Sequence, residues 1–368
     1  MHLEELQTPC LILDRVALER NLETMRSIAL RHGVKLRPHL KTAKSADIAR
    51  MAVGGTAGGI TVSTLAEAEY FADHGFADIT LAAGITPQKL GRAAALLSRG
   101  VMLRVITDDE ETAAAIARHP SPFRTLVEID CGDHRGGISP NSDELLRIGR
   151  ALGGKLDGVL THAGHSYGCR DVECIKQVAE QERSAVVLAA KRLSGEGLTC
   201  ETISVGSTPT MRHADNLDGV TEMRPGVYMF ADLFQVEINS CEREDIAVTV
   251  LASVIGRRLD ENRILVDAGA LALSKDRSTQ VTQHDAGYGV IWNLEGRPVY
   301  GNCVIDRVSQ EHGNATSDVR LPFEELQVGT KVRIAMNHSC LTAAAYDRYY
   351  VVAGGQEVVE TFDRVNGW

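Results

Sequence analysis

Apolar residues in the first 230 positions form short runs that alternate with helical patterns. After the apolar run 11–13, for example, segment 16–32 has apolar residues three and four positions apart, which predicts an amphipathic helix after a strand. This rhythm recurs about eight times and is typical of a parallel sheet with intervening helices, here a closed (β/α)8 barrel of the TIM type. The predicted strands are 11–13, 34–36, 59–62, 79–82, 101–106, 125–129, 158–161, 202–205 and 219–223.

The pattern changes after about residue 235. Short strand-like runs then follow closely on one another without long helical patterns, which predicts a smaller, mainly antiparallel β domain. We therefore expect a barrel at 1–235 and a β domain at 236–368, with the first residues of the chain as candidates to pair with the β domain. The later predicted strands are 247–256, 263–267, 289–292, 304–310, 330–336 and 348–354.

Composition narrows the classes of function. The chain has 39 Lys and Arg against 49 Asp and Glu, a net charge of −10, with the basic residues scattered, which argues against a nucleic-acid partner. No apolar run approaches the roughly 18 residues that cross a bilayer, and the acidic N-terminus lacks the apolar segment of a secretory signal. We therefore expect a cytoplasmic protein without a membrane partner.

The chain contains eight cysteines, too few for a disulfide framework at this length. Seven show no Cys-x-x-Cys spacing and are expected to be small, mostly buried side chains. They are Cys10, Cys131, Cys169, Cys174, Cys200, Cys241 and Cys303.

Polar residues gather where the predicted barrel strands end, which is where the active site of such a barrel is built. His39 and Lys41 are two positions apart, so on an extended chain they face the same side. Burial of Lys41 in a barrel mouth would lower its pKa toward the neutral amine that attacks aldehydes. Taken alone, Lys41 would ordinarily be interpreted as a solvated lysine. Because polar segments follow several of the predicted strands, we prefer the interpretation as a site residue. The segments are 37–41, 128–136, 161–167, 205–210 and 224–228.

One of these strand ends suits a phosphate group. Gly206, Ser207 and Thr208 follow an apolar strand and combine flexible backbone with two hydroxyls. The segment is not a P-loop, because no Gly-Lys-Ser or Gly-Lys-Thr follows it. A capped turn is the structural alternative.

Together these motifs resemble those of the alanine-racemase-like, fold-type III enzymes that use pyridoxal 5′-phosphate (PLP). The resemblance is to the D-threonine aldolase / D-serine dehydratase family, and most to its D-serine and D-threo-3-hydroxyaspartate dehydratases. The matching segments span nearly the whole chain in the family's order: Thr8-Pro9, Arg37-Pro38-His39-Leu40-Lys41, Asp133-His134-Arg135-Gly136-Gly137, Thr161-His162-Ala163-Gly164, Gly206-Ser207-Thr208-Pro209, Arg224-Pro225-Gly226-Val227-Tyr228, Asp267-Ala268-Gly269, Gln310-Glu311-His312-Gly313 and His338-Ser339-Cys340.

The resemblance implies a role for each of several residues. Lys41 would carry PLP as a Schiff base and act as the catalytic base. His162 would pack on the face of the pyridine ring, and Arg135 would lie near the ring nitrogen. The family's homodimer is implied as well. The remaining implied contacts are Gly206, Ser207, Thr208, Gly226 and Tyr228 for the phosphate, Tyr167 for the cofactor or substrate, and His39, Glu311 and His312 for the substrate or proton transfer.

His338 and Cys340 form a candidate metal pair. They are two apart in a strand-like stretch, so both side chains would point the same way. Imidazole and thiolate suit Zn²⁺, and two protein ligands leave positions open for water and substrate. A His-x-Cys pattern alone is ordinarily two buried side chains without a metal, but the family carries a metal pair at this place. Mn²⁺ and Mg²⁺ are the alternative ions.

The resemblance leaves three reactions to weigh. A dehydratase would convert a D-3-hydroxyamino acid (D-serine, D-threonine or 3-hydroxy-D-aspartate) to a 2-oxo acid and ammonia. An aldolase would instead give glycine and an aldehyde, but aldolases of this family usually have His-x-Asp where this chain has His-x-Cys, so we prefer the dehydratase. A racemase lacks its usual second acid/base here, and a non-catalytic PLP-binding protein would lack the β domain.

Overall fold

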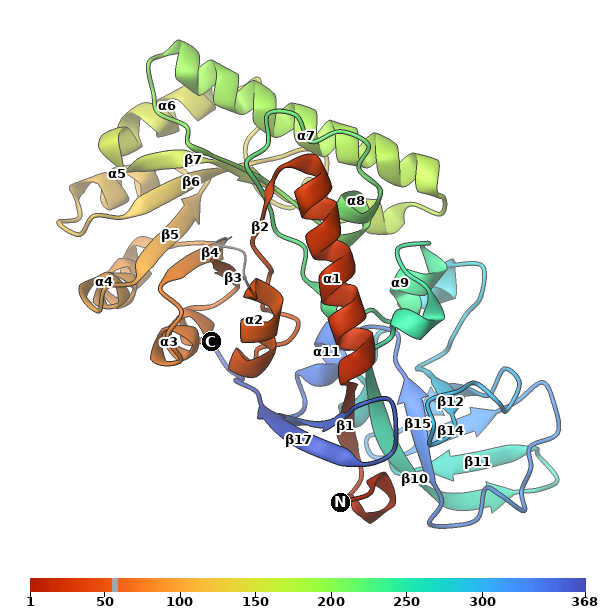
Figure 1. Cartoon of the computed structure of the whole chain (residues 1–368). Helices are drawn as coiled ribbons and strands as arrows, with labels where there is room; N and C mark the ends of the chain where they lie inside the picture. The colour runs from red at the N-terminus through yellow and green to blue at the C-terminus, as the bar shows by residue number, and fades with distance from the viewer. Residues whose placement is uncertain (55–58) are drawn as a thin grey trace. The chain divides into compact units, whose positions relative to one another are not determined.

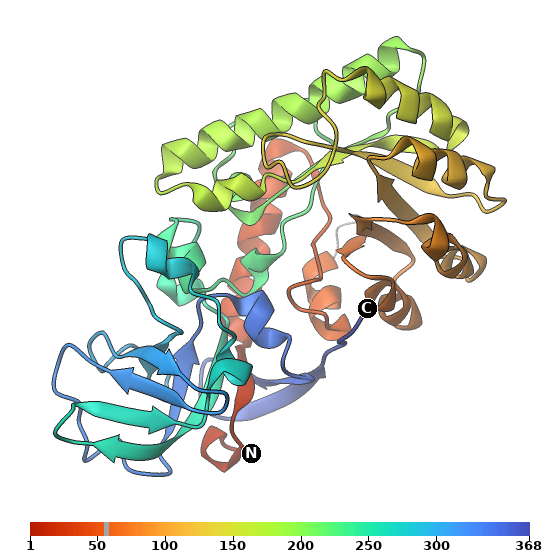
Figure 2. The ribbon, with the colours of Figure 1, turned by 180° about the vertical axis from the view of Figure 1, so that it is seen from behind.

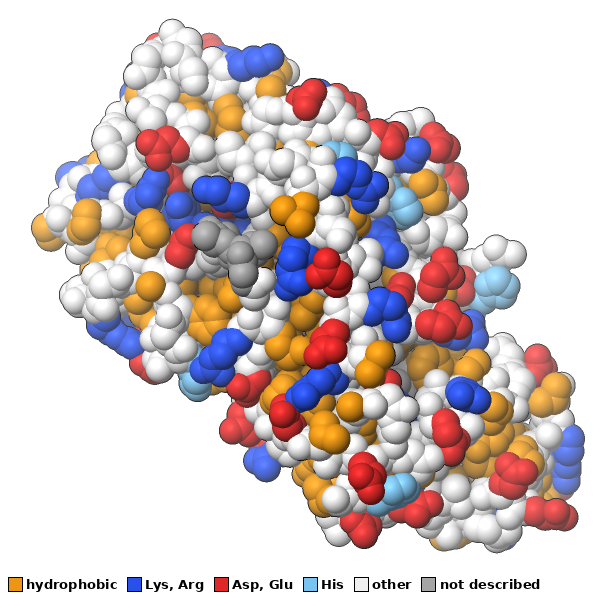
Figure 3. All heavy atoms as spheres, viewed as in Figure 1, with side chains coloured by type: hydrophobic (Ala, Val, Ile, Leu, Met, Phe, Trp, Pro, Cys, Tyr) orange, Lys and Arg blue, Asp and Glu red, His pale blue; other side chains and the backbone are white. Residues whose placement is uncertain are grey.

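The computed structural model describes residues 1–54 and 59–368, which group into two compact units. The unit called here the barrel unit comprises Thr24–Gly226 and Val365–Trp368, and the β unit comprises Met1–Glu23 and Val227–Arg364. The division of the folding domains at residue 235 stays a prediction. Charged side chains of both signs are interspersed over the face shown in Figure 3.

Eight parallel strands form the sheet of the barrel unit, in the order β2-β9-β8-β7-β6-β5-β4-β3. Figure 1 labels β2 to β7 of this sheet. The two edges of this sheet are joined, because His39 forms a parallel bridge with Thr61 of β3. The Leu40 N–H donates to the Thr61 carbonyl at 2.8 Å, and the Thr61 N–H donates to the Pro38 carbonyl at 3.0 Å. The predicted (β/α)8 barrel is thus confirmed. Its strands are β2 (Lys35–Leu36), β3 (Ile60–Val62), β4 (Asp78–Gly84), β5 (Met102–Thr107), β6 (Arg124–Ile129), β7 (Leu156–Thr161), β8 (Thr202–Val205) and β9 (Glu222–Met223).

Helices lie outside the barrel strands that they connect (Figure 1, and from behind in Figure 2). Several start at a side-chain acceptor for an otherwise unpaired N–H, such as Asp109, whose carboxylate accepts from the Thr112 N–H. The longest, α7, buries residues three and four apart, including Glu182 in an otherwise apolar stripe. The helices that connect barrel strands are α2 (Ala46–Val53), α3 (Leu65–Asp73), α4 (Leu90–Ser98), α5 (Glu110–Arg118), α6 (Asp143–Leu152), α7 (Val172–Gly195) and α8 (Thr208–His213), whereas α1 (Arg15–His32) precedes β2 and is divided between the two units.

Buried ion pairs join the barrel strands near their amino ends. Asp78 at the start of β4 lies 2.9 Å from Arg37 Nη2 and 2.6 Å from Arg104 Nη1. Arg104 Nε also lies 2.8 Å from Asp157 at the start of β7. Burial alone would raise the pKa of Asp78, but the two arginines lower it below its ordinary value. In barrels of this type the amino end serves stability, opposite the catalytic end.

A nine-stranded mixed sheet forms the β unit, in the order β11-β14-β13-β12-β15-β10-β1-β16-β17. All six strands predicted after residue 235 are present, and β14 and β17 were not predicted. The unit also contains the short helices α9 (Leu233–Glu237), α10 (Ala270–Leu273) and α11 (Ser339–Ala343). Its strands are β1 (Cys10–Asp14), β10 (Val248–Arg258), β11 (Arg263–Val266), β12 (Val290–Trp292), β13 (Val304–Val308), β14 (Gly313–Thr316), β15 (Lys331–Ala335), β16 (Arg348–Val352) and β17 (Val358–Asp363).

Two local expectations were wrong. The run 11–13, counted among the barrel strands, forms β1, which pairs antiparallel with β10 and parallel with β16, in agreement with the alternative that the first residues pair with the β domain. Its apolar residues are all buried, so its pattern could not indicate which sheet it joins. The stretch around His338 and Cys340 is not a strand, because His338 caps α11 and Cys340 lies inside that helix. In the described part of the chain, no helix combines the length and apolar character that crossing a membrane requires.

Candidate active site

A cavity of about 290 Å³ lies at the carboxyl ends of the barrel strands. Five predicted site residues line it, and they come from the loops after β2, β6, β7 and β8. Segments far apart in sequence therefore converge at the end of the barrel that carries catalysis in folds of this type. The five residues are His39, Lys41, Arg135, His162 and Gly206.

Lys41 follows the segment that joins the two edges of the barrel. Its side chain is exposed at the cavity rather than buried, so the desolvation expected from the sequence is absent. Its positive charge lowers the pKa of both His39 and His162, which line the same cavity. An accessible primary amine beside two uncharged rings can reach a ligand in the cavity.

His162 is held with its ring in the neutral form. Its Nδ1 lies 2.8 Å from the Gly206 carbonyl oxygen, which can only accept, so Nδ1 carries the hydrogen. Burial and, to a smaller extent, the charge of Lys41 lower the pKa of His162 to about 3. Burial likewise holds the pKa of His39 well below its ordinary value. A neutral imidazole fixed by its hydrogen bond is suited to pack flat against an aromatic ligand.

Two charged groups in the cavity, Glu128 and Arg224, were not singled out from the sequence. Glu128 Oε1 lies 3.7 Å from Nη2 of Arg135. Burial raises the pKa of Glu128, Arg135 lowers it, and the neighbouring Asp108 raises it further. Arg224 is buried and donates to the carbonyl oxygens of Val205 and Thr161. Both residues lie within the polar segments 128–136 and 224–228 that follow predicted strands, and this position was the sequence feature that could have identified them.

The predicted phosphate segment is a capped turn in the structure. The Ser207 hydroxyl accepts from the Thr210 N–H at 3.2 Å, and the Ser207 N–H donates to the Thr210 hydroxyl at 3.2 Å. The Ser207 hydroxyl is also 2.9 Å from that of Ser166. Gly206 has a φ of +141°, and a Cβ there would lie 2.6 Å from the backbone nitrogen of Arg224, so only glycine fits. The role of Gly206, Ser207 and Thr208 toward phosphate stays a prediction.

Glu182 on α7 forms hydrogen bonds to the loops after β7 and β8, and it was not predicted from the sequence. It is fully buried, and its Oε1 accepts from the N–H groups of Ala163 at 3.1 Å and Gly206 at 2.9 Å. Its Oε2 accepts from the Thr210 hydroxyl at 2.7 Å. Burial raises the pKa of this carboxyl, and the hydrogen bonds partly oppose that rise. One side chain thus ties the loop with His162 to the loop with Gly206.

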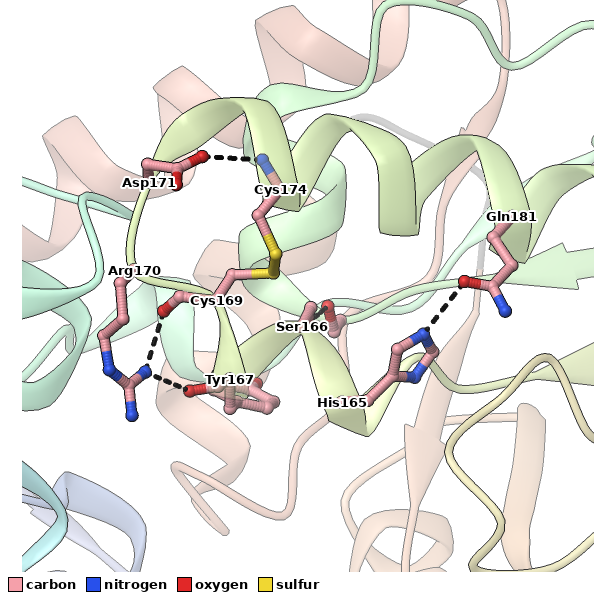
Figure 4. The surroundings of a disulfide bond; sticks show 9 residues. His165, Ser166, Tyr167, Cys169, Arg170, Asp171, Cys174 and Gln181 are labelled. Atoms are coloured by element: carbon pink, nitrogen blue, oxygen red, sulfur yellow. Dashed lines mark hydrogen bonds between the residues drawn. A yellow bond between two sulfur atoms is a disulfide. The ribbon is translucent and has the colours of Figure 1, made fainter. Parts of the chain in front are cut away.

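The loop that carries Tyr167 contains a disulfide that the sequence analysis did not expect. Cys169 and Cys174 are bonded, with their Cα atoms 5.6 Å apart, so the expectation of separate buried thiols was wrong for this pair (Figure 4). The pair flanks Asp171, whose side chain accepts from the Cys174 N–H at the start of α7. The chain turn that starts the helix brings the two residues together, which spacing alone did not indicate.

The remaining predicted cofactor contacts are Gly226 and Tyr167 of the barrel unit and Tyr228 of the β unit. Gly226 ends the first segment of the barrel unit, and a Cβ there would lie 2.8 Å from the His39 carbonyl oxygen. Tyr228 is buried in the 3₁₀ turn Val227–Met229 of the β unit. Their contacts with a phosphate, and that of Tyr167 with a ligand, stay predictions.

The predicted metal pair lies in the β unit. Burial alone would lower the pKa of His338, but hydrogen bonds to Asp276 and Cys340 raise it to about 11. His338 and Cys340 are therefore close together although they are not on a strand. Within residues 1–54 and 59–368, no three His, Cys, Asp or Glu side chains form a metal cluster. A metal here would rest on two protein ligands, as the sequence predicted.

Glu311 and His312 are exposed in the turn between β13 and β14. The His312 carbonyl accepts from the Ser309 N–H at 2.8 Å, which closes this turn. A Cβ on Gly269 would clash with the backbone nitrogen of His312, so the motif Asp267-Ala268-Gly269 packs closely on the same turn. Participation of the two side chains in catalysis stays a prediction.

Comparison with known proteins identifies the family. Residues 13–233 match the alanine racemase N-terminal domain, and residues 247–352 match a putative serine dehydratase domain. The chain is 42% identical to D-threo-3-hydroxyaspartate dehydratase from Delftia sp. (strain HT23), over 99% of this chain and 98% of that protein. It is 33% identical to D-serine dehydratase from Dictyostelium discoideum, over 100% and 98%.

The fold agrees with these matches. The solved structure of D-threo-3-hydroxyaspartate dehydratase from Delftia sp. HT23 superposes with a TM-score of 0.96 at 41% identity, covering 100% of each chain. The chain therefore belongs to the alanine-racemase-like family of PLP enzymes, in the group that carries the serine dehydratase domain.

Proposed function

We propose that this protein is a PLP- and Zn²⁺-dependent lyase that dehydrates D-3-hydroxyamino acids to a 2-oxo acid and ammonia. The observation that carries the proposal is the cavity at the carboxyl ends of the barrel strands, where the exposed amine of Lys41 adjoins the neutral ring of His162. Candidate substrates are D-serine, D-threonine and 3-hydroxy-D-aspartate. The sequence relation to a 3-hydroxyaspartate dehydratase favours the last of these.

The residues present fit PLP by their chemistry. Lys41 would supply a primary amine for the aldehyde, His162 a flat neutral ring to pack on the pyridine, and Arg135 a cation to interact with the ring nitrogen. PLP bound to an amino acid withdraws electrons from Cα, which makes the Cα–H bond breakable. Lys41 would remove that proton, and Arg135 and the buried Arg224 would favour binding of anionic groups.

His338 and Cys340 fit a zinc ion, because an imidazole and a thiolate are ligands that Zn²⁺ prefers over Mn²⁺ or Mg²⁺. Zinc held by only two side chains would supply a Lewis acid for a hydroxyl leaving group. The cysteine also favours the dehydratase over the aldolase, whose family members usually have aspartate at this position. The homodimer and the cytoplasmic location are retained as predictions from the family resemblance and the sequence.

The test is to incubate the PLP- and Zn²⁺-loaded protein with each candidate D-3-hydroxyamino acid and measure all products. We expect a 2-oxo acid and ammonia in equal amounts. Glycine with an aldehyde would refute the dehydratase in favour of the aldolase, and the L-enantiomer would indicate a racemase. Bound PLP without turnover of any substrate would identify a non-catalytic binding protein.

Attachment of the cofactor is tested by Lys41→Ala. The visible absorption of lysine-linked PLP should disappear together with activity, because no other predicted site residue supplies a primary amine. Lys89→Ala is the matched control, since this lysine is exposed at the 3₁₀ turn Pro87–Lys89 and its loss should leave both properties unchanged. Unchanged absorption in Lys41→Ala would refute Lys41 as the point of attachment.

A further inference from the structure

Segment 276–279 of the β unit is fastened to the residue that precedes the proposed metal pair. Asn337, directly before His338, is buried, and its amide donates to the carbonyl oxygens of Asp276 and Gly287. Its side-chain oxygen accepts from the Thr279 hydroxyl at 2.8 Å. These bonds fix the backbone of segment 276–279 beside the metal pair.

The carboxylate of Asp276 is directed at the imidazole of His338. Asp276 Oδ2 lies 3.3 Å from His338 Nδ1. The other oxygen, Oδ1, accepts from the backbone N–H of Ser278 at 2.8 Å and from the Ser278 hydroxyl. The Asp276 N–H donates to the Ser274 hydroxyl at 3.2 Å. Both oxygens of Asp276 are therefore engaged, and its side chain has one defined orientation.

The backbone around His338 is held by residues other than Asp276. Asp232 is buried and accepts from the backbone N–H of Ser339 at 3.0 Å and from its hydroxyl at 3.3 Å. The His338 carbonyl accepts from the Thr342 N–H at 3.1 Å inside α11. Loss of the Asp276 carboxylate should therefore free the imidazole ring while the backbone stays in place.

We propose that Asp276 is a positioning residue that fixes the tautomer and orientation of His338 so that its Nε2 binds the metal. A carboxylate can only accept, so Nδ1 keeps its hydrogen, and a metal that displaces the other ring proton finds the lone pair on Nε2. Partners of this kind orient metal-binding histidines in proteins, and their loss typically weakens metal binding about 10- to 100-fold. The inference rests on the metal pair of the proposed function.

The first experiment measures Zn²⁺ affinity of the PLP-loaded protein by competition with a chromophoric chelator. We expect Asp276→Ala to weaken binding about 10- to 100-fold, and Asp276→Asn to lose less when its amide oxygen accepts from Nδ1. Asp306→Asn is the matched control, because Asp306 is an exposed acid of the same unit whose carboxylate accepts from the Thr316 hydroxyl. Its affinity should equal that of the wild type.

A second readout separates orientation from general damage. Co²⁺ bound at the site should show a thiolate-to-metal absorption band from Cys340. In Asp276→Ala at saturating Co²⁺ this band should persist while the weaker metal-centred bands change, because the thiolate still binds and the imidazole is reoriented. Ser278→Ala retains the carboxylate but removes one of its supports, and it should give a smaller shift in the same direction. This variant keeps the proposal testable if Asp276→Ala does not fold.

Wild-type affinity and an unchanged Co²⁺ spectrum in Asp276→Ala and Ser278→Ala would overturn the positioning role. Failure of the metal pair itself looks different. In that case His338→Ala and Cys340→Ser would bind Zn²⁺ as the wild type does, and the zinc part of the proposed function would fail as well. Dependence on His338 and Cys340 without dependence on Asp276 would refute only this inference.

Discussion

Replacing Glu182 tests whether one buried carboxyl group holds the loops that carry His162 and Gly206 together. Its Oε1 is the acceptor for the N–H groups of Ala163 and Gly206. In Glu182→Ala both donors lose this partner in the interior, and each unpaired buried donor costs about 1–3 kcal/mol. We therefore expect the free energy of unfolding to fall by roughly 2–6 kcal/mol. The loops that carry His162 and Gly206 should loosen together, and PLP should bind more weakly.

Glu182→Gln should behave differently, because an amide keeps one acceptor oxygen of the same shape. That oxygen can serve both backbone donors, and the Thr210 hydroxyl can accept from the amide NH₂ instead of donating. We expect a loss of less than about 1.5 kcal/mol, the net value of one hydrogen bond. Glu180→Ala is the matched control, because Glu180 lies on the same helix, is exposed and pairs with Arg183. Pairs of that kind contribute about 0.2–0.5 kcal/mol.

The pH dependence of this pair of variants has a defined sign. Burial raises the pKa of Glu182 in the folded state, so its stabilising contribution is fully present below the unfolded pKa and is lost as the pH rises through the folded pKa. The glutamine does not titrate. Relative to the wild type, Glu182→Gln should therefore gain stability as the pH rises above the ordinary range of a glutamate.

Native-state hydrogen exchange is the suitable assay, because a chain with two compact units need not unfold in one step. The amides of Ala163 and Gly206 should exchange faster in Glu182→Ala and close to the wild-type rate in Glu182→Gln and Glu180→Ala. If all three variants lost the same protection, the argument from acceptor loss would be refuted. Equal losses for alanine and glutamine at position 182 would point to packing rather than hydrogen bonding.

Two further predictions concern stability. Arg37 and Arg104 lower the folded pKa of Asp78, so its contribution is present above the unfolded pKa and is lost as the pH falls through the folded pKa. Asp78→Asn should therefore lower the free energy of unfolding by about 3 kcal/mol at pH 7. In denaturant titrations this difference from the wild type should become smaller toward pH 3. A difference that does not change with pH would contradict this prediction. Breaking the Cys169–Cys174 bond, which closes a short loop, should cost about 2 kcal/mol, and alkylation of the denatured, unreduced protein should label six cysteines; labelling of all eight would show that the bond is absent.

The sequence predicted the barrel well because most of its strands are short apolar runs followed by a helix-period pattern. It placed the run 11–13 in the wrong sheet, since a fully buried strand has the same pattern in either sheet. β17 was missed for the opposite reason: it is an edge strand with mostly exposed and partly charged residues. The helix α11 spans only five residues, too few for a helical period to be recognised.

The site was predictable where side chains lie at strand ends. His39, Lys41, Arg135 and His162 share one cavity because the carboxyl ends of parallel strands meet at one end of a barrel. Glu182 was not predictable in the same way, because its partners are backbone groups of two loops that no side-chain pattern marks. Asp276 was missed because 62 residues separate it from His338, and a hydrogen bond over that distance leaves no spacing to read.

Charged side chains are paired at the amino end of the barrel, whereas positive charge is in excess at the carboxyl end. This difference explains why the carboxyl end can bind a ligand. At the amino end, Arg37 and Arg104 are buried and each is matched by carboxylates within 3 Å. At the carboxyl end, the cavity contains three cationic side chains and one carboxylate, and among the described residues Lys41 has no ion-pair partner. Cationic excess at the mouth of a protein with a net charge of −10 attracts anions to that point. PLP and amino-acid substrates both carry anionic groups, so the same uneven charge distribution would favour cofactor and substrate. The three cations and the carboxylate are Lys41, Arg135, Arg224 and Glu128.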